Sequence, residues 1–349
     1  MQFCDPFGRS DPDSILNYGW DDIPEYNYTF FFDQEPIHLN IHTPTFGSIR
    51  HLHAEDIHYN YPHMSPGSIV TSERDSDAVD MLCKEYGWRS YYYFFHGWAA
   101  LDWYRGYDKT FLIKPIAERA PTKTFIAPNR IIAGERKHRL EMLYHIFKLG
   151  MTDNHISCPA VCPVENISIV DAAKPLLKIY PDIQEVFAQQ QLPINFKDET
   201  DHPMHSCWLS LFDQSADSLL YLVTETVASG RRHHITEKTF KPIAMGMPFV
   251  LVATQGSLEY LRSYGFKTFG HIWDESYDTI ADPVERISAV ALLLKTLCDL
   301  SVTERIALFH DAIPAIEHNW NHFYGGGFEA ILWDELQSML KDIHAESRL

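Results

Sequence analysis

Apolar and polar residues follow one another in blocks along the chain, and the blocks predict strands and helices in alternation. Short apolar runs at Tyr28–Phe32, Ser68–Ser72 and Tyr91–Phe95 predict buried strands. Residues Asp77–Tyr86 have the spacing of an amphipathic helix, and Gly87 is expected to end it. An aromatic helix is expected from about Ala99 to Arg105. This alternation is typical of an open parallel sheet.

The same alternation begins again after a linker at Pro115–Thr122. Strands are expected at Thr124–Ala127, Ile167–Val170, Leu219–Thr224 and Pro248–Ala253. Helices are expected at Arg136–Leu149, Ala172–Gln190, Glu237–Met245, Ser257–Tyr264 and Pro283–Leu300. The chain is therefore predicted to be an α/β protein with two Rossmann-like domains that face a cleft. The N-terminal domain would cover residues 1–118 and the second domain 119–325, and a C-terminal helix in 326–349 could pack back on the first.

Composition and charge narrow the class of protein. The 349 residues suit two domains, and 45% hydrophobic with 22% charged residues is typical of a globular chain. No run approaches the roughly 20 apolar residues of a membrane span, and the first residues lack the layout of a signal peptide. The six scattered cysteines favour reduced thiols, so a cytoplasmic protein is expected. A formal charge of −18 disfavours a nucleic-acid partner, which only a local basic patch could serve: Arg231, Arg232, Lys238 and Lys241.

The segment Ile235-Thr236-Glu237-Lys238 carries the strongest candidate chemistry. Thr236 can cap a helix that begins near Glu237, after a core strand and a loop. Backbone N–H groups at a helix N-terminus favour an anion, and Lys238 and Lys241 would add to a preference for phosphate. Because Glu237 would repel phosphate, we assign it to the hydrogen bonds of a ribose diol. The alternative interpretation is a capped surface helix with Glu237 and Lys238 on its exposed face.

Together with other segments, this motif resembles the donor-binding motif of the α-1,3-fucosyltransferases and their relatives. In that family a strand, a loop, the letters ITEK, a helix and a G-x-P turn bind the nucleoside diphosphate of GDP-fucose. Gly246 and Pro248 supply the turn in this sequence. Further segments are similar to the family in the same order: Phe32-Asp33-Gln34-Glu35-Pro36, Arg74-Asp75-Ser76-Asp77, Arg136 at a helix start, and Tyr221–Glu225. The resemblance spans residues 28–280, and most of that span is unmatched.

The resemblance implies a glycosyltransferase of the GT-B type, which transfers a sugar from a nucleoside-diphosphate sugar to a hydroxyl with inversion and without a metal or other cofactor. A fucose-like sugar on a GDP or UDP donor is the leading expectation, with a glycan or another hydroxyl-bearing acceptor. Glu35 is expected to be the general base, and Asp33 is its rival. The expected donor-binding residues are Arg136, Glu225, Arg231, His234, Thr236, Glu237, Lys238 and Lys241. Those expected on the acceptor side are Arg74, His96 and Trp98.

Departures from the family leave the donor and the acceptor open. His234 stands where the family usually has Tyr, and Phe240–Met245 differ from the family's helix. The membrane anchor and paired C-terminal cysteines of the animal enzymes are not found, which suits a bacterial or viral enzyme.

Three alternative functions remain open. One is a glycosyltransferase for hydroxymethylated pyrimidines in phage DNA, and another is a non-catalytic nucleotide-sugar-binding protein. The third is a metal-dependent hydrolase, since imidazoles and a carboxylate a few residues apart can share an ion. Its ligands would be His51, His53, Asp56 and His58.

Overall fold

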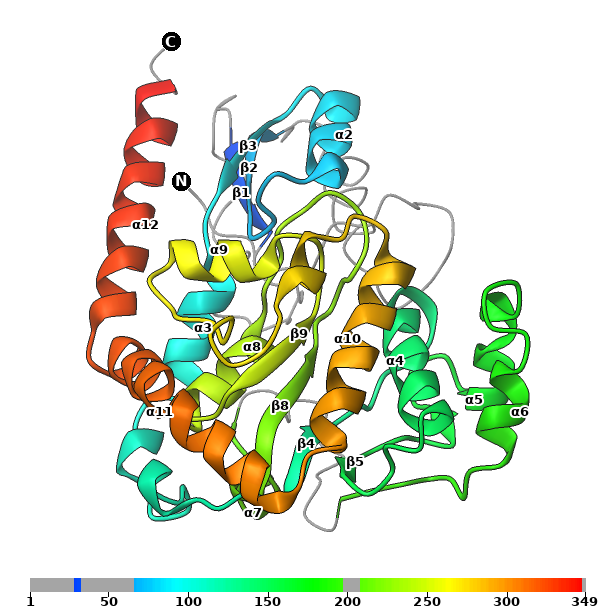
Figure 1. Cartoon of the computed structure of the whole chain (residues 1–349). Coiled ribbons are helices and arrows are strands. Elements are labelled where there is room, and N and C mark those ends of the chain that lie inside the picture. The colour runs from blue at the N-terminus through cyan, green and yellow to red at the C-terminus, as the bar shows by residue number, and fades with distance from the viewer. Residues whose placement is uncertain (1–27, 33–65, 197–207, 347–349) are drawn as a thin grey trace, which may run out of the picture. The chain divides into compact units, whose positions relative to one another are not determined.

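The computed structural model describes residues 28–32, 66–196 and 208–346 (Figure 1). Contacts within the chain separate two compact units. Unit 1 comprises the chain up to Trp98 with residues 230–234 and the end of the chain from Ala330, and unit 2 comprises Ala99–Ser229 and Ile235–Glu329. The units are divided between residues 98 and 99 and between residues 329 and 330. The corresponding boundaries expected from the sequence lie between residues 118 and 119 and between residues 325 and 326. Parallel strands combined with helices confirm the α/β class.

Unit 1 contains a three-stranded sheet. Its strands are β1 (Tyr28–Phe32), β2 (Pro66–Thr71) and β3 (Arg89–Tyr92), in the order β1-β2-β3 and all parallel. Phe32 pairs with Thr71, and Thr71 pairs with Tyr92, so the three strands end together at one edge. Ile69 and Val70 at the centre of β2 are almost completely buried. An apolar central strand of this kind is typical of a parallel sheet.

The helix after β2 begins and ends where the sequence predicts. Helix α2 spans Asp77–Tyr86, and the Ser76 hydroxyl accepts a hydrogen bond from the backbone N–H of Val79. At its other end Gly87 has a φ of 68°, a left-handed conformation that glycine adopts without a Cβ clash. The predicted helix is confirmed. Both of its ends could be predicted because the cap residues are local signals in the sequence.

The region after β3 differs from the prediction. The expected strand Tyr91–Phe95 ends at Tyr92, and α3 begins at Phe95 and ends at Trp103. A run of aromatic residues has high strand propensity, but propensity is a weak signal that tertiary packing overrides. Here Phe94 is fully buried and its backbone N–H donates to the Glu335 carboxylate at 3.0 Å. The chain therefore leaves the sheet earlier than its composition suggests.

The C-terminal helix α12 (Gly327–Glu346) contributes to the core of unit 1. Its residues Met339 and Ile343 pack with Val70 and Tyr93 of the β2–β3 region. Since these apolar side chains are all at least nine-tenths buried, the helix covers a face of the small sheet.

Unit 2 is built on a four-stranded parallel sheet. The strands are β4 (Lys123–Ala127), β5 (His155–Ile156), β8 (Ser218–Thr224) and β9 (Phe249–Val252), in the order β5-β4-β8-β9. Every residue of β8 and β9 is buried. Predicted strands Thr124–Ala127, Leu219–Thr224 and Pro248–Ala253 are thus confirmed, because uninterrupted apolar runs mark strands that are covered on both faces.

Helices follow the strands of this sheet along the chain and flank it (Figure 1). Their bounds are α4 Lys137–Lys148, α8 Glu237–Ala244, α9 Ser257–Ser263, α10 Pro283–Cys298 and α11 Val302–Tyr324. Helix α10 packs on α4, β4 and β9, whereas α8 and α11 pack on each other and on β8. The first four match helices predicted from the sequence to within two residues; α11 was not predicted.

The stretch between β5 and β8 is where the prediction is wrong. Instead of a strand at 167–170 and one long helix at 172–190, the chain forms an antiparallel pair, β6 (Val161–Cys162) with β7 (Ile167–Ser168), and short turns of helix. These are α5 Ile169–Ala172, η8 Lys174–Leu176 and α6 Ile183–Ala188, with α7 at Phe212–Ala216 before β8. Ser168 caps α5 by accepting from Asp171 N–H, and Pro175 and Pro181 interrupt a continuous helix.

Helix α11 anchors the chain that follows α9. His322 Nε2 donates to the Tyr264 carbonyl at 2.7 Å, and His318 Nε2 donates to the Gly265 carbonyl at 2.8 Å. Asn319 forms two hydrogen bonds with the backbone of Lys267. The polar residues of the His318–His322 segment therefore secure a turn of unit 2. Among the described residues, no helix is long and apolar enough to cross a membrane.

Candidate functional site

The carboxyl edge of the unit 2 sheet contains a point where the winding of the chain reverses. From β4 the chain continues to β5 on one side, and it later returns to β8 on the other side of β4. In open parallel sheets ligands bind outside the carboxyl ends of the strands at such a reversal. The residues that follow β4 and β8 are therefore the candidates for a ligand-binding site.

Buried polar side chains link the strand ends across this edge. The Asn129 backbone N–H donates to the Ser157 hydroxyl at 2.8 Å, and that hydroxyl donates to the Asn129 carbonyl at 3.2 Å. The Thr224 hydroxyl donates to Asn129 Oδ1 at 3.3 Å. All three residues are at least 94% buried. A buried polar group without a partner is costly, so this mutual pairing holds the three strand ends in register.

Glu225, directly after β8, is the centre of the arrangement. Its side chain is fully buried and its two carboxylate oxygens accept four hydrogen bonds. Oε1 accepts from Thr236 N at 3.0 Å and from the Thr239 hydroxyl at 2.6 Å. Oε2 accepts from the Thr236 hydroxyl at 2.6 Å and from Thr226 N at 3.2 Å. Each oxygen thus receives one backbone N–H and one hydroxyl.

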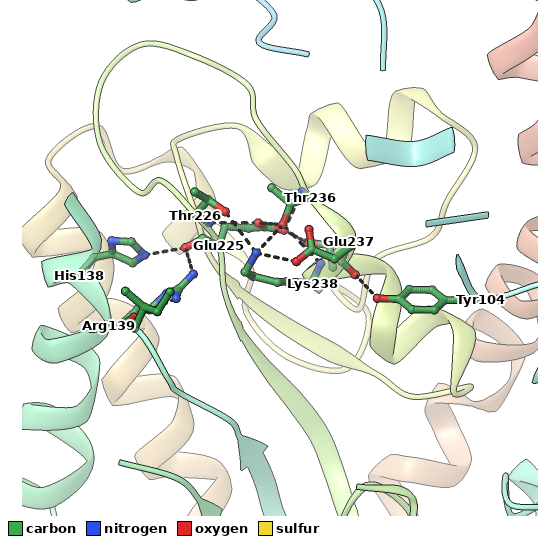
Figure 2. A network of polar contacts seen from close by, with 10 residues as sticks. Tyr104, His138, Arg139, Glu225, Thr226, Thr236, Glu237 and Lys238 are labelled. Carbon is green, nitrogen blue, oxygen red and sulfur yellow. Dashed lines mark hydrogen bonds and ion pairs between the residues drawn. The ribbon is translucent and has the colours of Figure 1, made fainter. Parts of the chain in front are cut away.

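The backbone carbonyl of Glu225 is also held, by helix α4 (Figure 2). His138 Nε2 donates to it at 2.8 Å and Arg139 Nη2 at 3.1 Å. A carbonyl can only accept, so the Nε2 atom of His138 carries the proton. Because Arg139 Nη1 also donates to the Ile131 carbonyl, α4 joins the loop after β4 to the end of β8.

Helix α8 begins where Glu225 holds Thr236. Thr236 is the N-cap residue and its hydroxyl accepts from Lys238 N–H at 3.4 Å. The Lys238 ammonium donates to Glu237 Oε1 at 2.8 Å and to the hydroxyls of Thr226 and Thr236 at 3.3 Å (Figure 2). The Lys238 side chain is 31% exposed, against 8% for Glu237. The result is an accessible cation at the positive end of a helix, positioned by three oxygen atoms.

Four of the expected donor-binding residues therefore meet in one network: Glu225, Thr236, Glu237 and Lys238. Tyr104 adds to it by donating to the Glu237 carbonyl at 3.4 Å. The Glu225 carboxylate is fully buried and accepts from four protein donors, so it lies beneath the α8 N-terminus. Of the other expected residues in unit 2, Arg136 ends η7 (Gly134–Arg136) just before α4 and is buried, and Lys241 lies one turn further along α8.

Arg231 and His234 belong to unit 1 with the Arg74–Asp77 segment. Arg74 and His233 form an antiparallel bridge with backbone hydrogen bonds of 3.0 and 2.8 Å. The Arg231 guanidinium donates to Asp77 at 2.7 Å and is largely exposed. The expected donor residue Arg231 is thus engaged by the acidic residue that opens α2.

The three expected acceptor residues also lie in unit 1. Arg74 is about half exposed and its guanidinium lies 5.6 Å from the centre of the Tyr92 ring. His96 is buried, and its ring makes an edge contact with the fully buried His234 at 5.0 Å. Trp98 contacts Trp333, an exposed residue of α12, at 4.9 Å between ring centres.

The expected general base Glu35 and its rival Asp33 lie outside the described residues, as do the proposed metal ligands His51, His53, Asp56 and His58. Within the residues that the structure describes, no group of three or more His, Cys, Asp or Glu could hold a metal ion.

Several residues of the network were not singled out from the sequence. They are Asn129, His138, Arg139, Ser157, Thr226 and Thr239. Asn129 and Ser157 carry a usable signal, because each is a polar residue that follows closely on a buried strand. His138 and Arg139 carry only the weaker signal of polar residues in the first turn of a helix, since their target, Glu225, directly follows a strand and lies 86 or 87 residues later in the chain.

Comparison with known proteins adds no relative. No protein-family model matches this chain, and no curated protein or solved structure matches it.

Proposed function

We propose that the protein is a glycosyltransferase that uses a nucleoside-diphosphate sugar, with two Rossmann-like domains of the GT-B type. The observation that carries the proposal is the accessible Lys238 ammonium at the N-terminus of α8. Lys238 donates to the Thr236 hydroxyl, which in turn donates to the fully buried Glu225. Backbone N–H groups and a positive helix end favour phosphate, and a fixed ammonium adds charge to them.

Glu237 gives the site a second feature. Its carboxylate pairs with the Lys238 ammonium at 2.8 Å. A diphosphate at the α8 N-terminus would compete with Glu237 for Lys238. The released carboxylate would then be an acceptor for the two hydroxyls of a ribose, which matches the chemistry of a nucleoside diphosphate better than that of free phosphate.

The proposed reaction is a single displacement at the anomeric carbon. The acceptor hydroxyl loses its proton to a carboxylate, its oxygen bonds to the anomeric carbon, and the nucleoside diphosphate leaves with the electron pair of the broken bond. Lys238, with Arg136 at the start of α4, would stabilise the charge that develops on the departing diphosphate. One displacement inverts the anomeric centre, and a fucose-like sugar remains the leading candidate on the sequence resemblance.

Binding of nucleoside diphosphates to Lys238→Ala tests the donor site. GDP and UDP should raise the melting temperature of the parent protein with EDTA present, since a ligand that binds only the folded state stabilises it. Lys238→Ala should weaken diphosphate binding by about 1.5–3 kcal/mol, the contribution of a charge-assisted hydrogen bond. Guanosine and uridine should bind nearly as before. Lys178→Ala, which removes an exposed lysine elsewhere, is the matched control. Unchanged diphosphate binding in Lys238→Ala would contradict the proposal.

The proposed general base is Glu35, with Asp33 as the rival carboxylate. Glu35→Gln keeps the shape of the side chain and removes its basicity, so sugar transfer should fall about 10²–10⁴-fold while donor affinity persists. Transfer would be measured with GDP- and UDP-sugars and a panel of hydroxyl acceptors, beside Asp33→Asn. An inactive Asp33→Asn with a fully active Glu35→Gln would assign the base to Asp33.

A further inference from the structure

Unit 2 contains a second candidate site, at the opposite end of α8. A cavity of about 630 Å³ is lined by the chain between η5 (Tyr107–Lys109) and Arg119, and by Trp320 of α11. This volume lies in the range that holds small organic ligands. Helix α8 has eight residues and so rises roughly 12 Å. The site around Lys238 is at its N-terminus, whereas the cavity wall is anchored at Met245 and Gly246, just beyond its C-terminus.

Arg119 holds the cavity wall in place. Its guanidinium donates to the carbonyl of Lys114 from Nε at 2.8 Å and from Nη2 at 2.7 Å. It also donates to the carbonyls of Gly246 at 2.6 Å and Met245 at 2.7 Å. Gly246 has a φ of 66°, and a Cβ there would come within 2.9 Å of the Ile116 side chain. The wall is therefore seated closely on the end of α8 and does not have to form when a ligand arrives.

The cavity is positively charged although the chain is strongly acidic. Lys109, Lys114 and Arg119 line it, against the single carboxylate of Asp108, in a chain of net charge −18. Arg119 is only 4% exposed, and among the described residues its guanidinium donates to carbonyls and pairs with no carboxylate. Burial lowers the pKa of Arg119 to about 10, which leaves it charged at neutral pH. Within the described part of the chain, the ammonium groups of Lys109 and Lys114 form no ion pair.

Apolar surface lies beside these charges. Phe111 is 94% exposed, the highest value among the large hydrophobic residues of the described chain, and Leu112 next to it is 50% exposed. Trp320 is partly buried and forms another side of the cavity. An exposed phenyl ring that borders a cavity is an unusual use of apolar surface, and such patches mark binding sites more often than single exposed residues do.

We infer that this cavity binds a small phosphate-bearing ligand with an apolar or aromatic body. Lys109 and Lys114 would contact the phosphate, and Phe111 and Trp320 would contact the apolar part. A free organic phosphate and the headgroup region of an anionic lipid share this chemistry. The inference does not depend on the proposed function, because none of these residues belongs to the network around Lys238.

Phenyl phosphate is the probe that tests the inference, measured by titration calorimetry beside inorganic phosphate. Phenyl phosphate should bind the parent protein more tightly than inorganic phosphate does. The double variant Lys109→Ala with Lys114→Ala should bind it roughly tenfold more weakly, as expected for two exposed ion pairs. Phe111→Ser should weaken phenyl phosphate about threefold or more and leave inorganic phosphate unchanged, because it removes only apolar contact.

Two control variants separate this site from the one around Lys238. Lys178→Ala should bind phenyl phosphate like the parent. Lys238→Ala should retain the phenyl phosphate binding that the Lys109/Lys114 double variant loses, and the double variant should keep its binding of GDP or UDP. Loss of phenyl phosphate binding in Lys238→Ala but not in the double variant would overturn the inference, as would no binding of phenyl phosphate at millimolar concentration.

Sedimentation with phosphatidic acid vesicles distinguishes the two sources of the phosphate. Sedimentation that phenyl phosphate prevents and the double variant lacks would support a lipid headgroup as the ligand. Binding of phenyl phosphate without sedimentation would support a free organic phosphate. Sedimentation that is equal in the parent and the double variant would count against the cavity as the site.

Discussion

Among the described residues, two buried carboxylates follow parallel strands, one in each unit, and they are held differently. In unit 1, Glu73 comes two residues after β2, accepts from the Ser76 hydroxyl at 2.5 Å and faces Arg232 Nη1 at 3.4 Å. In unit 2, Glu225 directly follows β8 and accepts from two backbone N–H groups and two threonine hydroxyls. Both side chains are inaccessible to solvent.

The difference shows how a carboxylate can be buried with or without a cation. The cation that faces Glu73 belongs to a long side chain, and Arg232 is 12% exposed, so its guanidinium has some access to water if the carboxylate is lost. The donors around Glu225 have no such freedom, since two of them are backbone N–H groups at the N-terminus of α8 and in the loop before it. Glu225 is thus tied to the local backbone, and the position of Lys238 depends on it through Thr236.

Replacement of the two carboxylates should therefore have unequal effects, and Glu225→Ala should have the largest. We expect it to lower the free energy of unfolding by about 3–5 kcal/mol, because four buried donors lose their acceptor. Glu73→Ala should cost about 1–3 kcal/mol, since Arg232 and Ser76 can find water or another acceptor. Chemical denaturation followed by tryptophan fluorescence measures both values.

Glu225→Gln sharpens the test. Each carboxylate oxygen of Glu225 faces one backbone N–H, so the amide group of Gln must point its own N–H toward one of them in either orientation. We expect a loss of about 2 kcal/mol, between the parent and Glu225→Ala. Equal stability of Glu225→Gln and the parent, or equal losses in Glu73→Ala and Glu225→Ala, would show that the two carboxylates are held alike.

The sequence predicts the elements around Glu225 well, because their signals are local. β8 is an unbroken apolar run, and Thr236 with Glu237 marks the start of α8. The contacts of His138 and Arg139 with Glu225 depend on which strand lies beside β4, and no local pattern contains the strand order. Helix α11 was not predicted for a different, local reason, since Pro314 lies inside it and interrupts the pattern of a helix.

A third buried carboxylate, Glu141 of α4, extends the comparison because it lacks the donors of the other two. Glu141 is 4% exposed, and its Oε2 atom has no hydrogen-bond partner among the described residues. Burial raises the pKa of the Glu141 carboxyl from an ordinary value of 4.5 to about 7. Lys137 on the same helix opposes the rise in pKa and Asp282, at the start of α10, adds to it. Tyr180 also faces this carboxyl, whose charge helps to raise the tyrosine's own pKa.

No local pattern predicts the burial of Glu141, because a glutamate in a helix is normally exposed. The burial of Glu141 depends on the elements that pack against α4, among them α6 and α10. Its titration therefore follows from the tertiary structure alone.

Glu141 should make the folded state less stable as the pH rises. A carboxyl whose pKa is higher in the folded than in the unfolded chain favours folding in its protonated form, so its contribution is complete below pH 4.5 and is lost as the pH rises to about 7. A shift of this size corresponds to about 3 kcal/mol at most. Glu141→Gln keeps a neutral side chain at every pH, so its free energy of unfolding should fall less than that of the parent between pH 5 and pH 8. Glu118→Gln, at an exposed position, is the control and should follow the parent. Denaturant titrations at a series of pH values measure the slopes, and parallel curves for the parent and Glu141→Gln would show that Glu141 does not titrate in this range.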